Sequence, residues 1–178
     1  MYKFYFFILL LLLPKSSFAS DAIYFFNPVA QETNISGQGI NDMVEDGDGF
    51  FWLATWRGLY RYDGYEAINY SLKIPQLNRA RKVTTLLYDQ NKIWLGTFVE
   101  GLYCYHLETG HVEHYAPEAL VKDVIALKLD HDGNLWVGSE ADGLCKINQD
   151  GTVEKFGPNN TQGMKHHQIS QIIEDETI

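Results

Sequence analysis

Residues 92–97 read Lys-Ile-Trp-Leu-Gly-Thr, and after three more residues the chain continues with Gly-Leu-Tyr at 101–103. Similar pairs of segments occur upstream and downstream: Phe-Trp-Leu-Ala-Thr at 51–55 with Gly-Leu-Tyr at 58–60, and Leu-Trp-Val-Gly-Ser at 135–139 with Gly-Leu-Cys at 143–145. The tryptophans of the three copies are 42 residues apart each time. This period organises the rest of the sequence.

Each copy is part of a longer repeat with four short β-like runs. The first run is rich in apolar residues and ends in aspartate, at 40–46, 83–89, 124–130 and 169–175. A turn with glycine or asparagine follows, and these residues suit the positive φ of tight hairpins. A helical repeat is excluded because no long segment has helical periodicity free of Gly, Pro or Asp-Gly breaks. The repeats cover about 40–82, 83–123 and 124–168, and 169–178 begins a fourth.

A four-stranded repeat of this length is typical of a β-propeller blade. The sequence therefore predicts an all-β, incomplete propeller of about three blades plus the start of a fourth. Trp94 and Gly96 share one face of their strand because side chains alternate, so a large residue lies beside a small one. That pairing lets the neighbouring sheet interdigitate. We expect a structural role for the repeated tryptophans and glycines: Trp52, Trp94, Trp136, Gly58, Gly101 and Gly143.

The aspartate-ending run, the glycine turn, Trp-Leu-Gly-Thr and Gly-Leu-x-x-Tyr together resemble the two-component regulator propeller repeat. The first copy, at 45–55 and 58–65, is the nearest match, and the resemblance covers about residues 22–178. It implies a periplasmic sensor, often for glycans or glycan fragments. In family members further blades, an Ig-like domain, an inner-membrane helix and a histidine kinase or diguanylate cyclase follow. A sensor of this kind would act through two states of a dimer, so a homodimer of the full-length protein is a further expectation.

The first nineteen residues predict a cleaved secretory signal. Lys3 precedes an apolar run at 4–13, Pro14 ends it, and residues 17–19 supply small side chains for signal peptidase. The run is too short to span a bilayer as a helix. Residues 20–178 are then the exported part, periplasmic or secreted, with an uncleaved N-terminal anchor as the alternative.

Three repeats do not close a propeller, which typically needs at least four blades. We therefore expect the N-terminal portion of a longer protein or the product of a truncated gene. In either case the remaining blades and the C-terminal signalling domains are its expected partners. The output activity of a kinase or cyclase would then lie beyond residue 178.

The charge of the chain argues against one class of partner. The chain has 14 basic and 23 acidic residues, whereas non-specific nucleic-acid binding needs a basic surface, so no nucleic-acid partner is expected.

Cys104 and Cys145 align to strand positions of different parity in neighbouring repeats. Stacked sheets lie about 10 Å apart, whereas a disulfide needs Cα atoms within about 7 Å. We expect two small buried hydrophobic residues, with an intramolecular bridge as the alternative.

The connections at one end of the propeller carry the candidate ligand contacts. The loops from strand four to strand one and from strand two to strand three share one rim in this architecture. The four-to-one loops are basic and would attract an anionic ligand such as an acidic oligosaccharide, unless they are ordinary solvated charge: Arg79, Arg81, Lys82, Lys122, Lys165, His166 and His167. The two-to-three loops offer aromatic rings for stacking on a sugar, unless these only pack between loops: Trp56, Arg57, Phe98 and Glu100.

No catalytic, metal or cofactor signature is present in the sequence. The Asp-rich turns at 46–49 and 130–133 lack the later ligands of a calcium loop and are interpreted as hairpins. His111 and His114 on a strand would point to opposite faces. Without a nucleophile elbow or a defensible carboxylate pair, we expect no enzyme within this chain. The alternatives to a sensor are part of a secreted propeller enzyme, such as a polysaccharide or cyclic-peptide lyase, and a passive interaction scaffold.

Overall fold

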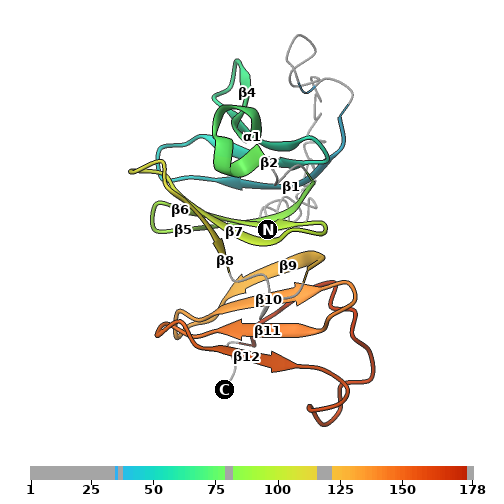
Figure 1. The fold of residues 1–178 in the computed structure, drawn as a ribbon. Helices are drawn as coiled ribbons and strands as arrows, with labels where there is room; N and C mark the ends of the chain where they lie inside the picture. Colours follow the sequence, from blue (N-terminus) through green and yellow to red (C-terminus); the bar gives the residue numbers. More distant parts are fainter. Residues whose placement is uncertain (1–34, 36–37, 79–81, 116–121, 176–178) are drawn as a thin grey trace, which may run out of the picture.

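The computed structural model describes residues 35, 38–78, 82–115 and 122–175. These residues form three four-stranded antiparallel sheets that follow one another from the first repeat to the third (Figure 1). The strands of each sheet pair in sequence order, as the blades of a propeller do. The predicted all-β fold with four-stranded propeller blades is therefore confirmed. The predicted signal at 1–19 lies outside the described residues.

The blades have the following strands. The first contains β1 (Ile40–Glu45), β2 (Phe51–Thr55), β3 (Gly58–Tyr62) and β4 (Ala67–Asn69). The second contains β5 (Val83–Asp89), β6 (Lys92–Thr97), β7 (Gly101–His106) and β8 (Val112–Tyr115). The third contains β9 (Val124–Leu129), β10 (Leu135–Ser139), β11 (Leu144–Ile147) and β12 (Val153–Phe156).

Two short helices, α1 (Tyr70–Lys73) and η1 (Pro75–Asn78), follow the first blade and were not predicted. Asn69 caps α1, since its side-chain oxygen accepts a hydrogen bond from the Leu72 amide at 3.0 Å. Leu77 of η1 is fully buried in the core between the first two blades. This helical insertion at 70–78 is therefore fixed by a cap and by tertiary burial. Within the described part of the chain, no helix has the length and apolar character to cross a membrane.

Neighbouring blades interlock at the small residue of the tryptophan strand. A Cβ added to Gly96 would lie 2.6 Å from Cγ1 of Val124, which begins the next blade. A Cβ on Gly138 would lie 2.7 Å from Cγ2 of Ile169. In the first blade, the buried Trp52 ring lies 5.7 Å from the Tyr105 ring of the second, edge-on. The large-beside-small pairing thus lets the next blade approach, as the sequence predicts.

The first strands of successive blades are also tied by hydrogen bonds. Asn41 Nδ2 donates to the Val83 carbonyl at 2.7 Å, and Asp42 Oδ2 accepts from the Leu86 amide at 2.7 Å. Between the second and third blades, the Thr84 hydroxyl donates to the carbonyl of Val124. These bonds satisfy backbone groups at the edge of each sheet, where the ladder ends. The contacts agree with first strands that line the propeller axis.

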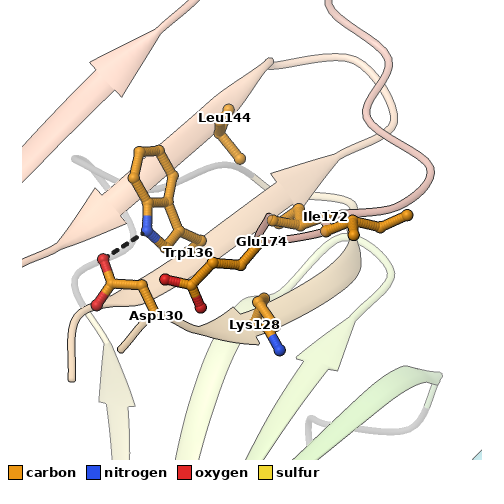
Figure 2. Close-up of a pocket in the computed structure, with 7 residues that line it drawn as sticks. Lys128, Asp130, Trp136, Leu144, Ile172 and Glu174 are labelled. Atoms are coloured by element: carbon orange, nitrogen blue, oxygen red, sulfur yellow. Dashed lines mark hydrogen bonds between the residues drawn. The ribbon is translucent and has the colours of Figure 1, made fainter. Parts of the chain in front are cut away.

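An aspartate after the first strand binds the tryptophan indole in the first and third blades. Trp52 Nε1 donates to Asp46 Oδ2 at 2.7 Å, and Trp136 Nε1 donates to Asp130 Oδ2 at 2.9 Å (Figure 2). The bond closes each first hairpin over its tryptophan. We call it the Asp–Trp clip.

The second blade lacks the Asp–Trp clip. Its turn is one residue shorter, and Gln90 and Asn91 adopt φ values of 42° and 67°. Asp89 is consequently still in strand β5 and pairs with Lys92. Among the described residues, no atom accepts a hydrogen bond from the buried Nε1 of Trp94. A buried donor without a partner costs about 1–3 kcal/mol.

Residues 169–175, the start of the fourth repeat, form no β-strand. They nevertheless occupy the edge of the third blade, because the Ile169 amide donates to the Ser139 carbonyl at 2.8 Å. Further along, Glu174 Oε1 accepts from the His131 amide at 3.0 Å. A strand needs a neighbour for its ladder bonds, and no described strand pairs with 169–175.

The two cysteines lie in the core between the second and third blades. Neither Cys104 nor Cys145 forms a disulfide, and both are at most 1% exposed. Burial raises the pKa of the Cys104 thiol to about 12, so it stays protonated at neutral pH. Both residues behave as small buried hydrophobic side chains, as the sequence predicts.

The interlock predicts a steric effect of adding one methyl group. Gly96→Ala places a Cβ within 2.6 Å of Val124 and should lower the free energy of unfolding by about 1–3 kcal/mol, the usual cost of overpacking. Urea denaturation measures it. The matched control is Gly39→Ala, because a Cβ there meets no atom within 4 Å. Equal stability of the two variants would contradict the interlock.

The Asp–Trp clip predicts unequal effects of the same substitution in two blades. Asp130→Ala removes charge-assisted bonds worth about 1.5–3 kcal/mol, whereas Asp89→Ala should change the free energy of unfolding by less than about 0.5 kcal/mol. Chemical denaturation of both variants at neutral pH provides the test. A larger loss for Asp89→Ala would show that the second blade has a clip.

The effect of Asp130→Ala should also depend on pH. Burial raises the pKa of Asp130, but hydrogen bonds from Asn134 and Trp136 outweigh this and lower it from 3.8 to about 2. A lowered folded-state pKa stabilises the protein above the unfolded pKa and loses that contribution as pH falls through the folded one. The difference between wild type and Asp130→Ala should therefore shrink between pH 4 and 2. A difference that stays constant over this range would contradict the assignment.

Candidate functional site

A hydroxyl residue at the end of each second strand shapes the loop that follows. Thr55 Oγ1 donates to the Gly58 carbonyl at 2.8 Å, and Thr97 Oγ1 donates to the Gly101 carbonyl at 2.7 Å. Ser139 Oγ in the third blade accepts from two loop amides. All three hydroxyl residues are fully buried. Their equal position in the three copies is a sequence signal for hydroxyls that fix the loops, and it was not among the predictions.

The glycine that begins each third segment has a left-handed backbone. The φ values are 116° at Gly58, 78° at Gly101 and 88° at Gly143. At Gly143 a Cβ would also lie 2.5 Å from the Phe156 carbonyl oxygen. Only glycine adopts this conformation without strain. The short two-to-three loops therefore turn sharply at fixed positions.

Two aromatic residues from neighbouring blades meet at this rim. The rings of Trp56 and Phe98, which we call the aromatic pair, lie 6.2 Å apart in an edge-to-face arrangement. Lys82 Nζ lies 5.1 Å from the Phe98 centroid and 6.0 Å from that of Trp56. Trp56 is 53% exposed. Three side chains that the sequence places on separate loops of one rim are thus brought together.

Val99 follows the aromatic pair and has a strained backbone. Its φ is 82°, a region that β-branched residues rarely occupy. The Val99 amide donates to Asp123 Oδ1 of the third blade at 2.8 Å, which holds the loop in place. The side chain is 54% exposed, so the strain is not offset by burial. Backbone outliers of this kind concentrate at functional sites.

A cavity of about 390 Å³ opens beside Trp56. We call it the rim cavity, and its lining residues are Trp56, Arg57, Tyr60, Asn69, Ser71, Leu72 and Asn78. The helical insertion supplies one wall, which Ser71 fixes by accepting a hydrogen bond from the Leu59 amide at 2.9 Å. The sequence does not predict this cavity, because it does not predict the helical insertion that forms one of its walls.

The other predicted rim residues lie in several places. Lys122 is exposed, and its backbone amide donates to Asp142 Oδ2 at 3.0 Å. The Glu100 carbonyl accepts from His114 Nε2 at 2.7 Å. Lys165, His166 and His167 are exposed beyond the third blade. No hydrogen bond, ion pair or ring contact joins these described residues to the aromatic pair, and Arg79 and Arg81 lie outside the described part of the chain.

Two further cavities lie between blades or at a blade face. One of about 420 Å³ lies at the opposite end from the rim, between turns of the second and third blades, and includes Asp89, Trp94 and Asn148. Another of about 320 Å³ lies on the third blade against residues 172–174 (Figure 2). There Trp136 occupies the position that Trp52 uses to contact a following blade. Among the residues described, no three His, Cys, Asp or Glu side chains are arranged to hold a metal ion.

Comparison with known sequences supports the repeat assignment. The sequence model of the family described as "Two component regulator propeller" matches residues 34–57 and 120–141. These segments contain the aspartate turn and the tryptophan strand of the first and third copies. The resemblance found in the sequence is thereby confirmed. A search of curated proteins finds no match.

Solved propellers share the fold over most of this chain. The extracellular domain of the putative hybrid two component system BT4673 from B. thetaiotaomicron is 23% identical with a TM-score of 0.64, covering 78% of this chain and 18% of that one. The corresponding domain of BT3049 is 24% identical with a TM-score of 0.63, covering 72% and 20%. Virginiamycin B lyase from Staphylococcus aureus is 15% identical with a TM-score of 0.50, covering 66% and 41%.

At these identities the likeness establishes the fold alone. The chain spans about a fifth of the length of the two B. thetaiotaomicron extracellular domains. The same fold occurs in the lyase, so the architecture by itself is compatible with both a sensor and an enzyme. Function has to be inferred from the rim.

The strain at Val99 predicts a stabilising substitution. Val99→Gly should raise the free energy of unfolding by about 0.5–1 kcal/mol, because glycine adopts positive φ without the Cβ clash. Val99→Ala removes the exposed side chain but keeps a Cβ in the left-handed region, so it should gain less. Urea melts of the two variants give the comparison. If Val99→Gly were the less stable of the two, the loop would not be strained.

Proposed function

We infer that this chain, which carries two-component regulator propeller repeats, is the extracytoplasmic ligand-sensing propeller of a signal-transduction protein. Its blade architecture is that of the extracellular domains of two hybrid two-component systems. The predicted secretory signal at 1–19 agrees with a periplasmic or secreted location. The output module, a histidine kinase or diguanylate cyclase, would lie outside this chain.

The aromatic pair is the observation that carries the proposal. An exposed aromatic side chain beside a half-buried one forms a continuous apolar surface, as Trp56 and Phe98 do, and such surfaces mark binding sites more often than isolated residues do. Trp56 and Phe98 are held by loops that buried hydroxyls fix, so their rings are positioned before a ligand arrives. Such rings offer an apolar face to the C–H face of a sugar ring. The ligand class that fits is a glycan or glycan fragment.

The position of the pair suggests how binding could be transmitted. Trp56 follows β2 in the first blade, and Phe98 follows β6 in the second. A ligand that contacts both rings spans the joint between two blades and favours one relative arrangement of them. A ligand shifts an equilibrium only by its difference in affinity for the two states. In the full-length homodimer that we propose, this difference would bias the output module.

Removing the aromatic ring tests the site. A glycan array identifies the ligand, and titration calorimetry then compares variants. Trp56→Ala should weaken binding about tenfold or more, since burying a large side chain contributes about 1.5–3 kcal/mol. Tyr65→Ala is the matched control, because Tyr65 is an aromatic residue 90% exposed in a turn at the other end of the blade. Equal binding by both variants would contradict the rim site.

A further inference from the structure

One of the described residues that line the rim cavity is a cation, Arg57. Arg57 is exposed and lines the cavity. Its backbone is anchored, since the amide donates to Thr55 Oγ1 at 3.1 Å and the carbonyl accepts from Asn69 Nδ2 at 3.4 Å. Among the described residues, no carboxylate lies within salt-bridge distance of Arg57. The described residues thus leave the Arg57 guanidinium without an ion pair, while two hydrogen bonds hold its backbone in place.

The surroundings of Arg57 are positive within an acidic protein. The chain has a formal net charge of −9, yet the described residues that line the rim cavity include no Asp or Glu. A second cation, Lys82, lies over the Trp56 ring. In the part of the chain that the structure describes, Lys82 also makes no salt bridge. Two cations close to Trp56 in the sequence or in space, Arg57 next to it in the chain and Lys82 against its ring, attract a negatively charged group.

The shape of the rim cavity adds a ring-binding surface to this charge. Its volume of about 390 Å³ falls within the usual range of small-ligand pockets, about 300–1,000 Å³. Trp56 and Leu72, 53% and 72% exposed, add apolar surface to the same cavity that Arg57 lines. An arginine fork matches the paired oxygens of a carboxylate or a sulfate.

We propose that the rim cavity binds the carboxylate or sulfate group of an acidic sugar unit, with Arg57 as the residue that selects it. The inference rests on the proposed glycan-sensing function and specifies which glycans the aromatic pair receives. Within the described ranges, the helical insertion follows the first blade alone. The selective subsite is accordingly a feature of one blade, whereas the interlock is shared by all.

Titration calorimetry of the full chain tests the selectivity with three oligosaccharides of equal length: an oligogalacturonide, a sulfated galactan oligomer and a neutral galactan oligomer. Arg57→Gln should weaken the acidic ligand about tenfold or more, the effect of losing a charged hydrogen bond. The same substitution should change the affinity for any neutral ligand by less than about twofold. Arg57→Lys, which keeps the charge but loses the fork, should fall between. The two acidic arms distinguish carboxylate from sulfate.

Lys155→Gln is the control for a general charge effect, because Lys155 is an exposed cation on β12 of the third blade. An unchanged thermal midpoint shows that Arg57→Gln is folded. Equal loss of acidic and neutral ligands, or no loss in Arg57→Gln, overturns the charge selection but leaves glycan sensing intact if Trp56→Ala still weakens binding. Failure of wild type to bind any of the three sugars or any arrayed glycan overturns the proposed function and this inference together.

Discussion

The packing of the blades depends on a small residue in the tryptophan strand. Gly96 and Gly138 leave the space into which Val124 and Ile169 fit, each at the start of the next repeat. Close packing makes this contact sensitive to a single methyl group. The residue that follows the small position, Thr97 or its equivalent, then fixes the rim loop through its hydroxyl. One short motif therefore both stacks the blades and positions the loops that differ between them.

Much of this arrangement could be predicted from the sequence because it repeats. The period of the tryptophans predicts the blades, and the alternation of side chains along the strand predicts the interlock between blades. The rim assignment correctly brought Trp56, Phe98 and Lys82 to one end, since propeller connectivity fixes which loops are neighbours. These features follow from local pattern and topology. Their ligand remains a proposal.

The features that could not be predicted depend on three-dimensional context. The insertion at 70–78 is only four helical residues and a 3₁₀ turn, too short for a periodicity signal, and it is fixed by the burial of Leu77. The lost clip at Trp94 follows from a one-residue difference in turn length, whose effect on the indole appears only in space. The second blade thus combines an unpartnered buried donor with the strained Val99 beside the aromatic pair. Both features are expected to lower the stability of the blade that contributes Phe98 to the proposed site.

Three of the four tryptophans belong to the scaffold and one to the proposed site. Fluorine NMR of the chain labelled with 5-fluorotryptophan separates these roles during titration with a glycan identified on an array. Trp52 and Trp94 are buried, Trp136 lines the cavity on the third blade, and Trp56 is exposed at the rim. The account predicts a large shift of the Trp56 resonance, assigned with Trp56→Phe, and small shifts of the other three. A ligand that moved the Trp94 or Trp136 resonance and left that of Trp56 unchanged would contradict it.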